Sequence, residues 1–320
     1  MKHQPGPQHA WRPLARRPLW AGTPALNMAL TVMAGLLAVV CGGNEGPPTG
    51  AANSGGRLEV VTTIEILADL ARNVGGDRVS IRSLVPPGVD VESFQTTPQD
   101  SIAVSRAGVI VVNGLGLDAS LEQVVEGARR IGTVLVVAAE GLGTGPGEAA
   151  KSGDPHFWQD PLLAIHYVER IRDGLASADP VYAPVYQANA DAYVAELRQL
   201  DLEIAQTLAG VPAQHRRLVT MHDAFGHFAA RYRWETSALA LSDASQVSPA
   251  DVAAVIERVR GDGIPAVFVE PQFGRAVMEE VARQAGVRVG TLYSDALDDK
   301  VTTYVGMMRF NAKSLAEHLK

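Results

Sequence analysis

From Leu58 onward, short runs of β-branched residues alternate with segments that have the hydrophobic spacing of helices. The predicted strands of the first half are LEVVTT, VSIRSLV, VIVVNG and TVLVVAA, with helical segments such as EILADLARNV between them. The same order returns after about residue 215, where RLVTMH, TSALAL, AVFVEP and VRVGTLYSD alternate with segments such as SPADVAAVIERVR. Strands that alternate with helices build mainly parallel, buried sheets. The sequence therefore predicts an α/β fold with two lobes, each a mainly parallel sheet flanked by helices.

One long helical segment separates the two halves. Pro184 suits its first turn, and Gly210 with Pro212 suits its end. The 26 residues from Pro184 to Ala209 would extend about 39 Å at about 1.5 Å per residue, which is enough to join two lobes as a rigid helix. Apolar residues spaced to line one face of this helix are Tyr193, Leu197, Leu200, Ile204 and Leu208.

The first forty residues are basic and then apolar. They contain four Lys or Arg residues, no acidic residue occurs before Glu45, and an apolar run covers 25–40. This order is typical of a secretory signal, and the apolar run is shorter than the ~20 residues that span a bilayer. We therefore predict an exported protein rather than one with a permanent transmembrane anchor.

Cys41 ends the apolar run and is the only cysteine of the chain. A stretch rich in Gly, Ser and Pro follows it up to residue 56, and such a composition forms a flexible tether. The arrangement resembles a bacterial lipoprotein signal, in which the cysteine becomes the lipidated first residue, although Val40 stands where a small residue is usual. An ordinary cleaved signal is the alternative. We expect an extracytoplasmic protein of the cell envelope, lipid-anchored through Cys41 or periplasmic.

Composition excludes several functions. The formal net charge of −7 opposes binding to nucleic-acid phosphates, so no nucleic-acid partner is expected. A single cysteine excludes an intrachain disulfide and a zinc cluster built from cysteines. Hydrophobic residues make up 47% of the chain, so packing alone can stabilise a large core.

Side chains suited to metal binding fall near the ends of predicted strands. His222 closes RLVTMH, Asp295 follows VRVGTLYS, His156 lies in the turn GDPHFWQDP, and the loop PPGVDVESFQTTP carries Asp90 and Glu92. Open α/β sheets bind ligands at the carboxyl ends of their strands, so these edges could face one cleft. Two imidazoles with two carboxylates suit Zn²⁺ or Mn²⁺. A site filled by protein ligands leaves little room for a reacting water, which favours binding over catalysis.

The segments DPHFWQDP and MHDAFGHFAARY are the most specific part of a wider resemblance. Together with GGDRVSIRSLVPPGVD, SRAGVIVVNGLGLD, VFVEPQF and TYVGMMRFN, they resemble the cluster A-I solute-binding proteins. These are the metal-binding receptors of bacterial ABC transporters for zinc and manganese, and they include zinc-uptake and adhesin-type lipoproteins. The resemblance runs from about residue 60 to the end of the chain. It implies a metal held between two lobes that one rigid helix joins.

The resemblance also assigns residues. Its second, third and fourth metal ligands fall on His156, His222 and Asp295. The family usually has Pro-His where this chain has Val91 and Glu92, so a carboxylate replaces the first histidine. The His-rich loop of many zinc-specific members is absent, because the segment before DPH contains no histidine. These departures affect the identity of the metal more than metal binding itself.

Three further carboxylates, Asp154, Asp160 and Asp223, are expected to orient the imidazoles. The expected organisation is a signal peptide, a tether, a first lobe, a connecting helix and a second lobe. Their predicted boundaries are 1–40, 41–56, 57–179, 180–210 and 211–320.

The expected function is non-enzymatic: a monomer captures a transported metal ion and delivers it to an ABC permease. Zn²⁺ is favoured over Mn²⁺ by the two imidazoles and the intrinsic order of affinities, while the two carboxylates keep Mn²⁺ open. One alternative is a metal-dependent periplasmic hydrolase, although the sequence has no HExxH and no GxSxG motif. Another is an adhesin-type interaction protein that has lost its metal.

Overall fold

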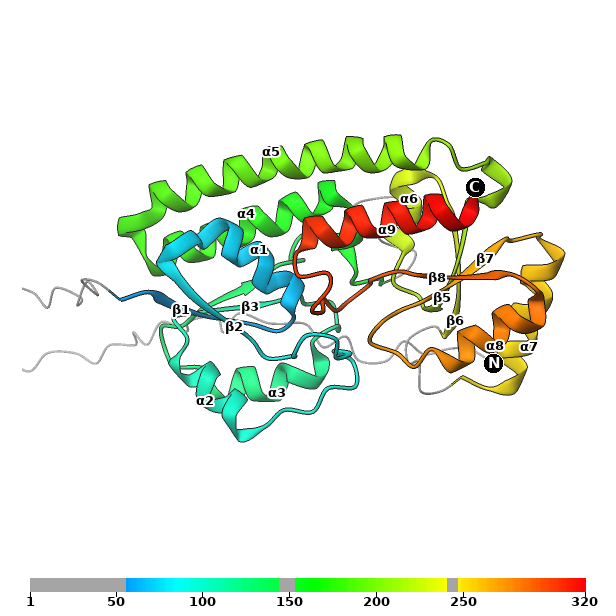
Figure 1. Cartoon of the computed structure of the whole chain (residues 1–320). Coiled ribbons are helices and arrows are strands. Elements are labelled where there is room, and N and C mark those ends of the chain that lie inside the picture. Colours follow the sequence, from blue (N-terminus) through cyan, green and yellow to red (C-terminus); the bar gives the residue numbers. More distant parts are fainter. Residues whose placement is uncertain (1–55, 144–152, 241–246) are drawn as a thin grey trace, which may run out of the picture. The chain divides into compact units, whose positions relative to one another are not determined.

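The computed structural model describes residues 56–143, 153–240 and 247–320 (Figure 1). The predicted signal peptide, the tether as far as residue 55 and Cys41 lie outside these residues. None of the helices in the described ranges has the length and apolar character needed to cross a bilayer.

The first lobe is built on a four-stranded parallel sheet with the strand order β2-β1-β3-β4. Residues of the central strand β3 are all buried, as expected for a sheet covered on both faces. The strands are β1 (Leu58–Thr62), β2 (Val79–Ser83), β3 (Val109–Val112) and β4 (Val134–Val137). The helices of this half are α1 (Glu65–Gly75), α2 (Pro98–Arg106), α3 (Ala119–Ala128) and α4 (Pro161–Ala178).

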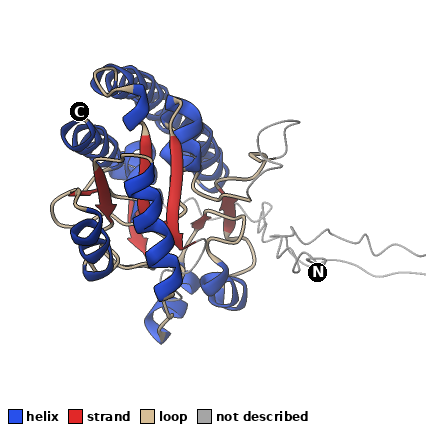
Figure 2. Cartoon of the chain, turned by 90° about the vertical axis from the view of Figure 1, so that its right-hand side faces the viewer, coloured by secondary structure: helices blue, strands red, loops and turns tan. Residues whose placement is uncertain are grey.

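The second lobe contains two parallel strand pairs, β5-β6 and β7-β8, and β5 lies beside β7. Figure 2 shows strands and covering helices in a view turned from that of Figure 1. The strands are β5 (Arg217–His222), β6 (Glu235–Ala240), β7 (Ala266–Val269) and β8 (Arg288–Thr291). The helices are α6 (Gly226–Tyr232), α7 (Pro249–Gly261), α8 (Ala276–Ala285) and α9 (Tyr304–Leu319). Short 3-10 turns are η1 (Gly76–Arg78), η3 (Phe157–Gln159), η4 (Pro180–Tyr182) and η5 (Ala213–His215). The prediction of two α/β lobes is confirmed.

The long connecting helix α5 (Ala183–Leu208) has 26 residues and begins one residue earlier than its sequence predicts. It packs against α4 and against α9 (Figure 1). The five apolar residues predicted to share one face are all buried. Asp201 is buried on α5 as well, where its carboxylate accepts hydrogen bonds from Arg231 Nε at 2.8 Å and Tyr232 Oη at 3.0 Å. The Asp201 carboxylate thus attaches this helix to α6.

One hydrophobic core extends through both lobes. Leu67 and Leu70 of α1 belong to the same buried cluster as Met307 and Met308 of α9. A second cluster packs the strands of the second lobe against the helices α7 and α8. Because the lobes share buried side chains, a wide hinge opening would expose apolar surface, which costs roughly 25 cal/mol per Å².

Candidate metal centre

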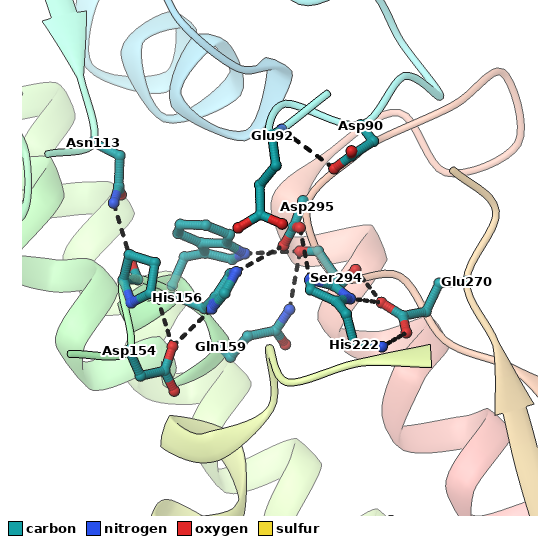
Figure 3. Close-up of polar contacts among 12 residues, drawn as sticks. Asp90, Glu92, Asn113, Asp154, His156, Gln159, His222, Glu270, Ser294 and Asp295 are labelled. Atoms are coloured by element: carbon teal, nitrogen blue, oxygen red, sulfur yellow. Dashed lines mark hydrogen bonds and ion pairs between the residues drawn. The ribbon is translucent and has the colours of Figure 1, made fainter. Parts of the chain in front are cut away.

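His156 lies in a turn that is held by hydrogen bonds with Asp154 and with Asn113. It precedes η3, is 3% exposed, and donates its backbone N–H to Asp154 Oδ1 at 3.0 Å. The same oxygen lies 2.7 Å from His156 Nδ1, so Nε2 points away from Asp154 (Figure 3). Asn113, which follows β3, donates from Nδ2 to the carbonyl of Pro155 at 3.1 Å and accepts from Tyr167 Oη at 2.5 Å. Asp154 therefore sets the direction of this imidazole, and the end of β3 holds the turn that carries it.

His222 is the last residue of β5, and its side chain is likewise held at Nδ1. Nδ1 lies 2.7 Å from Oε2 of Glu270, the residue that directly follows β7. Both residues are buried, with exposed fractions of 2% and 1%. His222 Nε2 is thereby directed toward the first lobe's His156, and the two rings lie 5.4 Å apart at their centroids.

Asp295 lies between the two imidazoles (Figure 3). Its Oδ2 is 2.9 Å from His222 Nε2, and its Oδ1 is 3.6 Å from His156 Nε2. The three residues offer one ligand atom each within 4.8 Å of one another. Both Nε2 atoms and both Asp295 oxygens are buried and face one another. Two imidazole nitrogens and a carboxylate that converge on one buried point are a donor set suited to a transition-metal cation.

The electrostatics of the three residues are coupled. Burial lowers the pKa of His222, but the carboxylates of Glu270 and Asp295 outweigh it and raise this pKa well above its usual value. His156 has a raised pKa as well, because Asp295 and Asp154 overcome the effect of burial. Burial raises the pKa of Asp295, but the two imidazoles hold it below the usual value. The site therefore stabilises positive charge at the point where the three side chains meet.

Glu92 lines a pocket together with His156 and His222 but is not part of the compact group formed by His156, His222 and Asp295. The residue is exposed and follows β2 in a turn where Asp90 accepts the N–H of Ser93 at 3.1 Å. Its carboxylate is turned toward Asp295 in Figure 3. Burial of the carboxylate and repulsion by Asp295 raise the pKa of Glu92 to about 7. The pocket has a volume of about 290 Å³ and is lined by Glu92, Leu115, Gly116, Leu117, Gly153, Asp154, Pro155, His156, His222 and Asp223.

The three carboxylates expected to orient the imidazoles occupy different places. Asp154 contacts His156, as described above. Asp223 is exposed and lines the pocket, and its pKa is raised by burial of the carboxylate and by repulsion from Asp154. Asp160 instead caps α4, where it accepts the N–H of Leu162 at 2.8 Å and lies 4.0 Å from Arg231. Asp160 precedes the first residue of the helix, where backbone N–H groups have no partner within the helix, so its carboxylate accepts one of them.

Two further residues of the site lie outside the set predicted from the sequence. Glu270 stands behind His222, although its place directly after the strand AVFV in VFVEPQF follows the same strand-end rule that selected His222. His227 contacts the turn that carries His156, because its Nε2 lies 3.1 Å from the carbonyl oxygen of Asp154. Its ring stacks on Phe157 with a centroid distance of 4.1 Å. Glu270 thus contacts the ring of His222, and His227 contacts the turn that carries His156.

Two imidazoles and a carboxylate, buried between α/β lobes that share one connecting helix, define a two-lobed binding protein. Residues 60–318 match the family of the zinc-uptake complex component A, a periplasmic protein also called ZnuA. The chain belongs to this family, which places it among extracytoplasmic proteins of the bacterial cell envelope.

Relatives in this family carry names with different metals. The manganese-binding lipoprotein MntA of Halalkalibacterium halodurans is 33% identical over 289 residues, which cover 89% of this chain and 95% of the relative. The iron-binding protein YfeA of Yersinia pestis is 31% identical over 267 residues, covering 82% and 86%. Among solved structures, the periplasmic zinc-binding protein TroA of Treponema pallidum superposes with a TM-score of 0.77 at 29% identity, covering 82% of this chain and 99% of TroA.

Proposed function

We propose that this protein is an extracytoplasmic receptor that binds one divalent transition-metal ion between its lobes and delivers it to an ABC permease. The observation that carries the proposal is the group of buried ligand atoms on His156, His222 and Asp295, which lie within 4.8 Å of one another. His156 comes from the first lobe, whereas His222 and Asp295 come from the second, so a bound ion would cross-link the lobes. The names of the relatives agree with metal binding by this fold.

Glu92 is the proposed fourth ligand. Its carboxylate lies in the field of Asp295 and faces the same pocket, and that repulsion would be relieved by a cation between the two carboxylates. Because Glu92 is on an exposed loop, a small movement of that loop would complete the coordination. The other three ligands sit on buried segments that are already in place. Capture would thus require little change in the lobes themselves.

Zn²⁺ is the proposed cargo, since two imidazole ligands and the intrinsic order of affinities favour it over Mn²⁺. Mn²⁺ is the second candidate, because Glu92 and Asp295 would supply two oxygen ligands and several relatives are named as manganese-binding. Transport of either ion involves no chemical change, so the receptor needs no general base. A metal-dependent hydrolase, by contrast, needs an open coordination position for water.

The membrane attachment belongs to the same proposal. Lipidation of Cys41 would tether the mature chain to the membrane that holds the permease. Expression of the full chain and of Cys41→Ser, followed by membrane fractionation, tests it. Loss of the membrane-bound fraction in the variant is expected, and an unchanged fraction would remove Cys41 from the proposal.

Calorimetric titration of the metal-stripped mature chain with Zn²⁺ and with Mn²⁺ tests the receptor function. One tight site per chain is expected, weakened in Glu92→Ala and unchanged in Glu169→Ala, an exposed carboxylate on α4. The order of the two affinities ranks the metals. Tight binding that is indifferent to Glu92 would leave three protein ligands and an open position, which returns the hydrolase as the better hypothesis. Absence of tight binding for both ions would refute the metal receptor.

A further inference from the structure

Glu270 occupies the centre of a buried network behind the candidate metal ligands. Its Oε1 accepts the backbone N–H groups of Met221 at 2.9 Å and His222 at 3.2 Å. Its Oε2 accepts from Ser294 Oγ at 2.5 Å and lies 2.7 Å from His222 Nδ1 (Figure 3). All four partners are donors or, for Nδ1, able to donate. The carboxylate therefore acts purely as an acceptor.

The position of this carboxylate is fixed from both lobes. Ser294, which holds Oε2, is itself held through its carbonyl oxygen by Trp158 Nε1 at 2.8 Å and Gln159 Nε2 at 3.0 Å. Both donors belong to the turn that follows His156 in the first lobe. Ser294 also precedes Asp295 in the chain. One chain of hydrogen bonds thus connects the surroundings of all three buried ligands, and Glu270 has little freedom to turn away from His222.

The contact between Glu270 and His222 Nδ1 bears on which ring nitrogen of His222 carries the proton. A neutral imidazole carries one proton, and only the other nitrogen can bind a metal ion. We propose that Glu270 is a positioning residue, which accepts the Nδ1 proton of His222 and so keeps the lone pair on Nε2, the atom that faces Asp295. The proposal rests on the metal-binding function proposed above. It explains why a carboxylate, rather than a neutral acceptor, lies 1% exposed behind this strand.

Glu270→Gln separates this role from simple packing. The amide oxygen of Gln can still accept the N–H groups of Met221 and His222, which leaves the amide nitrogen facing Nδ1. That nitrogen can only donate, so Nδ1 becomes the acceptor and the proton moves to Nε2. We expect Zn²⁺ affinity to fall by roughly 10- to 100-fold, the usual effect of losing a partner behind a metal-binding histidine.

A second readout follows the tautomer directly. The ¹⁵N chemical shifts of the His222 ring in the metal-free chain at alkaline pH, where imidazoles are neutral, should show the proton on Nδ1 in the wild type and on Nε2 in Glu270→Gln. Asp201→Asn is the matched control, because it changes another buried carboxylate to an amide without touching an imidazole. The control should retain the wild-type tautomer and the wild-type Zn²⁺ affinity.

Each outcome decides the inference. Wild-type affinity and an Nδ1 proton in Glu270→Gln would overturn it, as would equal losses of affinity in Glu270→Gln and Asp201→Asn. If Glu270→Gln does not fold, the wild-type spectrum still decides, since a proton on Nε2 would overturn the assignment. A wild-type chain that binds neither Zn²⁺ nor Mn²⁺ refutes the proposed function, whereas the tautomer in the metal-free protein remains a separate test of Glu270.

Discussion

Nε2 of His222 lies 2.9 Å from Oδ2 of Asp295, so the two groups contact each other through the atoms that a metal ion would use. His156 approaches the other oxygen of the same carboxylate at 3.6 Å. In the metal-free protein, a proton on either imidazole is stabilised by this carboxylate. A metal ion needs the same nitrogen lone pairs, so protons and metal compete for one place.

This competition predicts a dependence on pH. The pKa values of His156 and His222 are both raised in the folded chain, so metal binding must release protons around neutral pH. Metal affinity is therefore expected to fall as pH decreases through these raised values. The stability of the metal-free fold should change in the opposite direction. A raised imidazole pKa contributes stability that is full below the unfolded value of ~6.5 and is lost as pH rises through the folded value.

Two measurements check this prediction. Calorimetry of Zn²⁺ binding in buffers with different ionisation enthalpies gives the number of protons released, and urea unfolding of the metal-free chain across neutral to alkaline pH gives its stability. Release of protons and a decrease in stability with rising pH are expected together. Binding without proton release would show that the imidazoles are already neutral and would contradict the coupling.

Replacing Glu92 with histidine should shift the preference between metals. An imidazole at this position supplies a third nitrogen ligand, which favours Zn²⁺, and removes an oxygen ligand that suits Mn²⁺. We expect the ratio of Zn²⁺ to Mn²⁺ affinity to rise on the order of tenfold in Glu92→His, or about 1.4 kcal/mol. Competition titrations of the two ions measure the ratio, with Glu169→His as the control. An unchanged ratio would mean that Glu92 does not contact the metal.

The sequence predicts the elements of this fold closely, because each depends on local spacing. The apolar face of α5 and each run of β-branched residues lie within one continuous segment, so the pattern can be read from the sequence alone. The strand-end rule likewise selects His222 and Asp295. What it cannot show is which strand ends become neighbours in space. Glu270 lies behind His222 because β7 runs beside β5, and that adjacency is a property of the folded sheet.

Asp160 is a residue that the sequence selects for the site but that the fold uses elsewhere. Asp160, four residues after His156 in DPHFWQDP, is one of the three carboxylates predicted to orient the imidazoles. The residue is followed by a proline at the start of a helix, and the unpaired N–H groups there provide a nearer donor. Asp154, two residues before His156, reaches Nδ1 because the turn bends back on itself. The start of the helix, which the alternation of residues in this motif does not reveal, therefore decides what Asp160 contacts.

Gly226, the first residue of α6, is predicted to be sensitive because it lies against Asp154. A Cβ atom at this position would be 2.5 Å from Asp154 Oδ2, so the carboxylate would have to move. Since Asp154 holds His156, we expect Gly226→Ala to weaken Zn²⁺ binding roughly tenfold. Gly127→Ala in α3 is the control, because nothing lies within 4 Å of its added Cβ. Calorimetry of both variants checks this, and equal affinities would show that Asp154 is not needed to orient the ring.

The contact between Asp69 and Tyr304 predicts a loss of stability without a direct effect on the metal ligands. Asp69 Oδ2 accepts the buried backbone N–H of Tyr304 at 2.8 Å, which attaches the start of α9 to α1. The pKa of Asp69 is raised by burial, although the Tyr304 N–H partly opposes the shift. Asp69→Ala leaves that N–H buried and unpaired, at an expected cost of about 1–3 kcal/mol in the free energy of unfolding.

Urea unfolding of the metal-free chain measures this cost, with Asp77→Ala as the control. Asp77 is exposed in η1, so its removal should change the free energy of unfolding by no more than about 0.5 kcal/mol. Because α9 packs in the core that both lobes share, the whole chain should unfold in one transition in either variant. A separate early transition in Asp69→Ala would show instead that the lobes unfold independently, and the shared core would then not be what holds His156 close to Asp295.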